Sequence, residues 1–179
     1  MARQTDYVVL CEDKAQYTFA RRFLIGRGAH GRKFSPKYAP CGRGAGEQWV
    51  RDQFAPEVRK VRRHGAGRAL VVVIDADLAS VDERARSLHA RLSEAGLDPI
   101  RRDERIGLFV PRRNIETWIL YILDPARSGL SEEADYKRRV PGEGWAGDVQ
   151  RYAQQRAPKD DATPESLRLA CRDWERIAP

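Results

Sequence analysis

The sequence predicts an α/β fold: a layered domain with a central, mostly parallel sheet flanked by helices, followed by a polar helical C-terminal extension. Two apolar runs rich in β-branched residues, at 7–11 and 69–74, have no polar interruption, which is typical of strands buried on both faces. Segments with helical spacing follow each run, and this alternation favours a parallel sheet. We place the α/β core at 1–125 and the extension at 126–179, packed together as one domain.

The first half of the chain is predicted to contain one strand and two helices. The strand at 7–11 leads into a helix over 13–25, where apolar residues fall near helical spacing. Residues 26–46 are rich in glycine, proline and basic side chains, so we expect a long loop. A helix over 47–63 follows, and Pro56 is a candidate interruption of it.

The middle of the chain repeats the strand and helix pattern. The second strand spans 69–75, and Ser80 is placed to cap a helix over 81–95, with acids in its first turn. The third strand is the apolar run 106–110, which ends at a proline.

The last third is predicted to be helical. Asn114 can cap a short, strongly apolar helix over 115–123. Two further helices are expected over 145–154 and 164–177, the second with a proline in its first turn.

Charge and cysteine content narrow the classes of function. The chain has 33 Lys and Arg against 26 Asp and Glu, a net charge of +7, which favours a polyanionic partner such as nucleic acid. A basic protein from an arginine-rich genome would show the same excess. Cys11, Cys41 and Cys171 form no CxxC pair, and the three histidines have no ligand spacing, so neither a disulfide framework nor a zinc site is expected.

Hydropathy predicts a cytoplasmic protein with no membrane partner. The first residues lack an apolar signal region, and no apolar run approaches the ~20 residues of a membrane span.

Three acids follow the two buried strands. Glu12 comes directly after the first strand, and Asp75 and Asp77 come at the end of the second. If these strands are adjacent and parallel, the three carboxylates meet at one edge of the sheet, and Asp75 and Asp77 share an orientation if the extended backbone continues through Asp77. Such a group favours a bound Mg²⁺ ion. Alternatively, Glu12 offsets a helix dipole and Asp77 is a cap or turn residue.

A strand that ends in Glu, followed by a strand that ends in Asp-x-Asp, resembles the Toprim domain of topoisomerases, bacterial primases and OLD-family nucleases. The segment Pro111-Arg-Arg-Asn-Ile-Glu-Thr-Trp118 is similar to the third element of small OLD-like Toprim proteins, and the resemblance covers about residues 5–123. The chain has Glu12-Asp13-Lys14 where many Toprim chains have Glu-Gly, and it has no Walker motif.

The resemblance implies a Toprim-like fold and an Mg²⁺- or Mn²⁺-dependent endonuclease, a hydrolase that cleaves DNA or RNA. Its pattern assigns metal ligation and catalysis to Glu12, Asp75, Asp77 and Glu116, and stabilisation of charge on the phosphate to Lys137. It also suggests a separately encoded ATPase partner and a role in antiviral (phage) defence.

The neighbours of these acids allow simpler interpretations. Glu116 lies about 100° from the apolar face of its helix and is either a first-turn acid or turned into a polar pocket. Lys137 lies in a charged run that is also compatible with a solvated surface. For nucleic-acid binding we select the basic residues of the glycine-rich loop and of the segment before the apolar helix, which are Arg27, Arg32, Lys33, Lys37, Arg43, Arg112 and Arg113.

Other functions stay open at this point. The chain could be a non-catalytic, Toprim-shaped binding or regulatory subunit, or a small RNA-maturation ribonuclease. Phosphatase chemistry of the HAD kind also uses a strand-end DxD, but normally on the first strand. The glycines at 42–46 lack the Lys-Ser/Thr ending of a phosphate loop, so we reject nucleotide binding there. The sequence leaves a homo-oligomer open.

Overall fold

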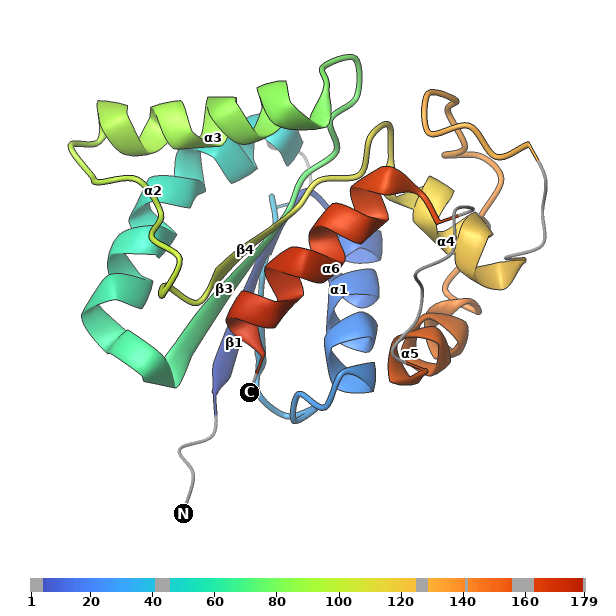
Figure 1. The fold of residues 1–179 in the computed structure, drawn as a ribbon, viewed down its shortest axis with the longest axis horizontal. Coiled ribbons are helices and arrows are strands. Elements are labelled where there is room, and N and C mark those ends of the chain that lie inside the picture. Colours follow the sequence, from blue (N-terminus) through green and yellow to red (C-terminus); the bar gives the residue numbers. More distant parts are fainter. Residues whose placement is uncertain (1–4, 41–45, 125–128, 141, 156–162, 179) are drawn as a thin grey trace.

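A four-stranded parallel sheet forms the centre of the molecule (Figure 1). The structure is a computed structural model that describes residues 5–40, 46–124, 129–140, 142–155 and 163–178. The strand order is β2-β1-β3-β4, and each neighbouring pair is parallel. The strands are β1 (Asp6–Cys11), β2 (Phe34–Lys37), β3 (Arg68–Val73) and β4 (Ile106–Phe109).

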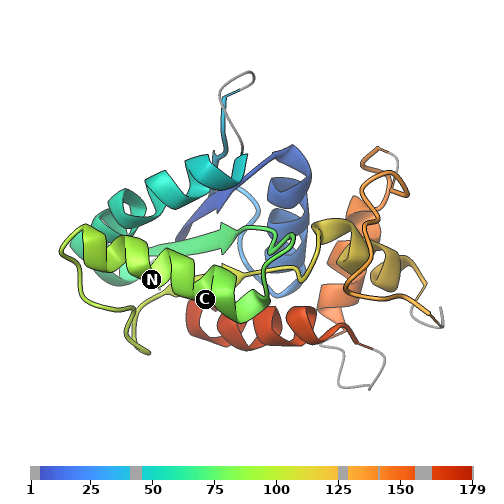
Figure 2. The ribbon, with the colours of Figure 1, turned by 90° about the horizontal axis from the view of Figure 1, so that it is seen from above.

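Helices cover both faces of this sheet (Figures 1 and 2). The described residues form six α-helices: α1 (Lys14–Gly26), α2 (Gly46–His64), α3 (Val81–Glu94), α4 (Ile115–Leu123), α5 (Ala146–Gln154) and α6 (Glu165–Ile177). Helices α2 and α3 lie on one face, and α1 and α6 lie on the other, with α4 and α5 beside them. None of the helices in the described ranges combines the length and hydropathy needed to cross a membrane.

Alternation along β3 divides the core between the two faces. Val71 and Val73 join the apolar cluster under α1, α4, α5 and α6, whereas Leu70 and Val72 join the cluster under α2 and α3. All four side chains are fully buried. A strand buried on both faces explains why the run has no polar interruption. The predicted α/β architecture with a parallel sheet is therefore confirmed.

The loop expected over 26–46 contains a strand that the sequence analysis missed. β2 pairs with β1 at the edge of the sheet, in the register Val8↔Ser35 and Leu10↔Lys37. Its sequence, Phe-Ser-Pro-Lys, has no apolar pattern because most of this edge strand is exposed. Pro36 is tolerated there because an edge strand leaves one side of its backbone without a partner strand.

Pro56 does not interrupt α2, which runs continuously from Gly46 to His64. An interior proline costs a helix about 3 kcal/mol. The helix also buries a stripe of apolar side chains against the sheet, and burial of each such side chain contributes roughly 1.5–3 kcal/mol. These side chains are Val50, Phe54, Val58 and Val61. Their burial outweighs the cost of the proline.

The two predicted helix caps have different outcomes. Ser80 caps α3 as expected, and Glu83 completes a reciprocal capping box that the sequence analysis did not predict. Asn114 occupies the N-cap position of α4, but its side chain makes no capping hydrogen bond. Its amide group instead reaches a residue of the 130–140 segment, because that segment folds back over the start of α4.

The C-terminal helices are part of the main core. α5 packs on α1, and α6 packs on β4. Leu167, Ala170, Trp174 and Ile177 of α6 are buried in the same cluster as β1 and β3. The segment that looks polar in sequence therefore presents one apolar face to the sheet, and the exposed faces of α5 and α6 carry the polar residues.

Contact between α1 and α5 depends on Gly26. A methyl group at Gly26 would lie 2.4 Å from the backbone oxygen of Gln150 and 2.7 Å from the Cβ atom of Ala153. We expect Gly26→Ala to destabilise the protein by about 1–3 kcal/mol, because the two helices must move apart. Gly147, near the start of α5, meets only the end of the Arg151 side chain at 3.4 Å.

Gly147→Ala is therefore the matched control, expected to stabilise the protein by about 0.5–1 kcal/mol through helix propensity. Urea unfolding followed by circular dichroism measures both variants. Equal effects of the two substitutions would show that the close approach at Gly26 is unimportant.

Candidate functional site

Parallel pairing of β1 with β3 brings Glu12 next to Asp75. The register aligns Cys11 with Val73, so the residues that follow these strands emerge side by side at the carboxyl edge of the sheet. The backbone N–H of Asp75 donates a hydrogen bond of 2.7 Å to Oε1 of Glu12. Gln16, buried on the first turn of α1, donates to the same oxygen at 3.3 Å and accepts a hydrogen bond from the Glu12 backbone N–H at 2.9 Å. The Glu12 carboxylate is thus held in place from two sides.

Asp75 is a buried carboxylate with incomplete hydrogen bonding. Its side chain is only 4% exposed, and its Oδ1 atom has no hydrogen-bond partner in the described part of the chain. Burial, followed by repulsion from Glu12, raises the pKa of Asp75 well above its usual range. Burial also raises the pKa of Glu12, and the charge of Asp77 adds to this shift. Two carboxylates at one edge therefore stay protonated to higher pH than usual, and nearby positive charge only partly offsets this effect.

Asp77 joins the same cluster through a turn and not through a continued extended backbone. β3 ends at Val73, and Asp77 has φ 55°, in the left-handed region, so the extended backbone does not continue through it. The condition for a shared orientation of Asp75 and Asp77 is therefore not met, and Asp77 is a turn residue, as the alternative interpretation had it. A turn closed by a hydrogen bond of 3.0 Å from Ala79 N–H to the Ala76 carbonyl turns Asp77 toward Lys137, whose Nζ lies 3.6 Å from its Oδ1.

Hydrogen bonds from two arginines fix this turn in position. Arg84 of α3 is buried and donates to the Ala76 carbonyl at 3.2 Å, and its other terminal nitrogen binds the carboxylate of Glu47. Arg112 donates to the Ala79 carbonyl at 2.7 Å and also binds Glu133. Arg112 is therefore engaged in holding the turn. The sequence analysis did not identify Arg84. Its position in the predicted helix over 81–95 does not distinguish it from the other polar residues of that helix.

Glu116 lies within electrostatic reach of the same group. It is half-buried at the start of α4, and its Oε2 atom is buried with no hydrogen-bond partner among the described residues. Burial raises the pKa of Glu116 above its usual value, and the nearby Lys137 partly opposes this shift. The charge of Glu116 in turn contributes to the raised pKa of Asp75.

Lys137 brings a positive charge to the cluster from the C-terminal part of the chain. Its burial alone would lower its pKa, but the carboxylates of Asp77, Asp75 and Glu12 outweigh burial, and the pKa is raised. The five residues selected from the sequence as catalytic therefore meet at the carboxyl edge of the sheet. Lys137 does not lie in a purely solvated run of charges.

An amide and a carboxylate position this lysine, and sequence reasoning missed both. Asn114 is 1% exposed and donates a hydrogen bond of 2.9 Å from its amide to Oδ1 of Asp135. The same oxygen accepts the backbone N–H of Lys137, also at 2.9 Å. Asn114 therefore connects the start of α4 to the segment that carries Lys137. The sequence analysis did single out Asn114, but it interpreted the residue as a helix cap.

Gly46 allows the N-terminal end of α2 to approach Glu12 closely. A Cβ atom at Gly46 would lie 2.8 Å from Glu12 Cβ and 3.0 Å from its backbone oxygen. The glycine-rich segment thus contributes to the site by its small size at this one position.

The basic residues selected for nucleic-acid binding divide between the two edges of the sheet. Lys37, Arg112 and Arg113 lie at the carboxyl edge with the acids. Arg27, Arg32 and Lys33 lie at the opposite, amino edge, because α1 runs back along the sheet before β2 begins. Arg43 lies outside the described residues.

The donor atoms of the cluster fit a hard divalent cation only in part. Carboxylate oxygens are the ligands that Mg²⁺ and Mn²⁺ prefer, and the free oxygens of Asp75 and Glu116 are uncompensated. Within the described ranges, however, no three His, Cys, Asp or Glu side chains stand together in positions to hold one ion. Mg²⁺ usually takes one or two protein carboxylates and keeps several waters. The site is compatible with that mode of binding.

Comparison with models of protein families, with curated proteins and with solved structures gives no match for this chain.

The raised carboxyl pKa values have a consequence for stability in metal-free buffer. Glu12, Asp75 and Glu116 bind protons more tightly in the folded state than in the unfolded chain. Their contribution to stability is therefore fully present below the unfolded values near about pH 4, and it is lost as pH rises through the raised folded values. We expect the free energy of unfolding of Asp75→Asn to fall less between about pH 5 and 8 than that of the wild type.

Urea unfolding in EDTA across this pH range provides the measurement. Glu94→Gln, an exposed substitution on α3, serves as the control and should follow the wild-type curve. Parallel curves for the wild type and Asp75→Asn would contradict the repulsion argued for this edge.

Proposed function

We propose that this protein is a divalent-metal-dependent nuclease of Toprim type, which hydrolyses phosphodiester bonds in nucleic acid with Mg²⁺ or Mn²⁺. The observation that carries the proposal is the meeting of four carboxylates and one lysine at the carboxyl edge of a parallel sheet, where such folds bind their ligands. The unpaired, buried Oδ1 of Asp75 supports it further, because an unpaired buried oxygen is costly unless a ligand uses it.

The carboxylates divide into two groups by their present contacts. Asp75 and Glu116 each have a buried oxygen with no hydrogen-bond partner among the described residues, so they are the ligands that we assign first to a metal ion. Asp77 and Glu12 complete the set of ligands. A bound divalent ion supplies Lewis-acid stabilisation of the phosphoryl group under attack.

The proposed roles of the remaining residues follow from charge and position. Lys137 stabilises the negative charge that develops on the phosphate, because its ammonium group already lies among the carboxylates. Glu12 orients the attacking water and takes up its proton, because Gln16 and the Asp75 N–H hold its carboxylate in place at this edge. Arg113, half-exposed beside the start of α4, holds a phosphate of the substrate.

DNA is the substrate that the family resemblance favours, and RNA is the alternative. The same resemblance suggests a separately encoded ATPase partner and a role in antiviral defence. The excess of basic side chains supports a polyanionic substrate of either kind.

A second candidate is a non-catalytic Toprim-like subunit that binds nucleic acid or regulates a partner. One observation favours it: an oxygen of Glu12 is occupied by the Asp75 N–H and by Gln16, so this carboxylate must rearrange before it can serve a metal ion. Calorimetric titration with Mn²⁺ distinguishes the two candidates, because the regulatory subunit would give no specific heat of metal binding.

We expect Asp75→Asn and Asp77→Asn each to abolish metal-dependent cleavage of labelled oligonucleotides while the protein stays folded. Both changes keep the shape of the side chain and remove the charge that attracts the cation. Glu94→Gln should cleave like the wild type. If both Asp variants retain wild-type rates in Mg²⁺ and in Mn²⁺, the nuclease proposal fails.

For Lys137→Gln we expect kcat to fall by roughly 10²–10³-fold, with a smaller change in KM, because its charge acts mainly on the developing phosphate charge. Arg138→Gln changes the neighbouring exposed cation and should leave kcat near the wild-type value. Cleavage rates at saturating substrate measure both. A fall in kcat of equal size in the two variants would mean that the net positive charge of this segment, and not the position of Lys137, affects catalysis.

A further inference from the structure

The amino edge of the sheet, opposite the acidic site, carries a second concentration of positive charge. Lys33 precedes β2, Arg68 begins β3 and Arg105 precedes β4, so three of the four strands have a cation at this edge. The fourth strand, β1, begins with Asp6, which pairs with Lys33 at 3.2 Å and lies beside Arg68 in the register.

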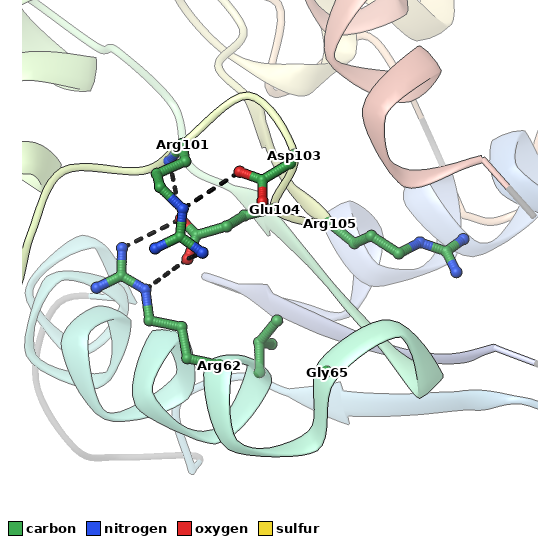
Figure 3. Close-up of a pocket in the computed structure, with 7 residues that line it drawn as sticks. Arg62, Gly65, Arg101, Asp103, Glu104 and Arg105 are labelled. Carbon is green, nitrogen blue, oxygen red and sulfur yellow. Dashed lines mark hydrogen bonds and ion pairs between the residues drawn. The ribbon is translucent and has the colours of Figure 1, made fainter.

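A cavity of about 360 Å³ opens at this edge between the end of α2 and the loop before β4. Figure 3 shows Arg62 and Arg101 converging on Glu104, while Arg105 points away from them. Arg62 binds Glu104 at 2.6 Å and also donates to the Asp98 and Pro99 carbonyls. These contacts join α2 to the loop before β4, so hydrogen bonds hold the wall of the cavity in position.

The acids around this cavity are already offset by cations. Glu104 lies between Arg62 and Arg101, Asp103 binds Arg101 at 3.2 Å, and Asp98 lies near Arg62. Arg63 and Arg102 follow Arg62 and Arg101 in sequence, and both are exposed. The side chains of Arg63, Arg68 and Arg102 have no hydrogen bond or ion pair with the part of the chain that the structure describes.

We propose that this amino edge is a second binding surface for the phosphate backbone of a nucleic acid, with Arg63, Arg68 and Arg102 as its contacts. Guanidinium groups bind phosphate through two parallel hydrogen bonds, and the cations left over after local pairing are all arginines. The choice of nucleic acid as the polyanion rests on the proposed function.

The distance between the two edges sets a length requirement. β3 has six residues, which span about 20 Å at ~3.3 Å per residue. A strand of nucleic acid advances about 3.4 Å per phosphate when it is stacked as in a double helix and roughly twice that when extended, so a single-stranded substrate needs at least about three nucleotides, and about six when stacked, to reach from the amino edge to the acidic site. Shorter substrates can engage only one edge at a time.

Binding is tested with Arg63→Gln/Arg102→Gln in EDTA and in an Asp75→Asn background, so that cleavage plays no part. Fluorescence anisotropy measures the affinity for a single-stranded oligonucleotide of roughly twelve nucleotides, about twice the length required when stacked, at several salt concentrations. We expect weaker binding and a salt dependence, log K against log salt, that is less steep by roughly 1.4, because two phosphate contacts are lost. Arg86→Gln/Arg151→Gln removes the same charge from exposed positions on α3 and α5 and should keep the wild-type slope.

Equal slopes for the two double variants would overturn the inference, as would a wild type that binds no oligonucleotide. A peptide nucleic acid of the same bases has no phosphates and should bind all versions alike. A difference that persists with this neutral backbone would also overturn the inference.

Cleavage separates this inference from the proposed function. With Asp75 restored, Arg63→Gln/Arg102→Gln should slow cleavage of the twelve-nucleotide substrate but not of a dinucleotide, which is too short to reach both edges. If the salt slope falls as expected and no version cleaves either substrate, the phosphate surface stands and the nuclease proposal fails.

Discussion

The parallel pairing of β1 with β3 is the contact on which the candidate site depends. It aligns Cys11 with Val73, and the next residues leave the sheet together. The hydrogen bond from the Asp75 backbone to Glu12 extends this pairing beyond the strands and turns a carboxylate toward a second, buried one. A shift of one residue in register would move each side chain of the strand to the other face, so the same register that buries the core also assembles the acids.

The cluster concentrates negative charge where the surroundings offer little compensation. Asp75 is buried, its Oδ1 has no partner in the described residues, and its pKa is raised. Lys137 relieves part of this repulsion and comes from a segment more than fifty residues later in the chain. Folded proteins tolerate such groups mainly at functional sites, where a ligand supplies the missing interaction. The free-energy cost of burying these carboxylates is therefore the strongest reason to regard this edge as a site of binding or chemistry.

Charge of opposite sign occupies the two ends of the same strands. Acids follow β1 and β3 at the carboxyl edge, and Lys33, Arg68 and Arg105 stand at the starts of β2, β3 and β4 at the amino edge. Helices connecting parallel strands run back along the sheet, so their C-terminal ends lie at the amino edge, and basic side chains there offset the helix dipoles. Arg105 acts in this way, since it donates to the Ile177 and Ala178 carbonyls at the end of α6. Arg63 and Arg102 make no such contact within the described residues, which is why a ligand is the better explanation for them.

The sequence by itself determined the parts of this protein that depend on neighbours along the chain. Uninterrupted apolar runs identified β1 and β3, and Ser80 identified the start of α3. The position of Glu12 and Asp75 at the ends of buried strands identified the acids of the candidate site. The tertiary structure alone decided the rest. β2 has no apolar pattern because it lies at an exposed edge. Asp77 adopts its conformation because Arg84 and Arg112 fix its turn. The Asn114 side chain binds Asp135 instead of capping α4. These features arise from contacts between residues far apart in the chain, and no local pattern encodes such contacts.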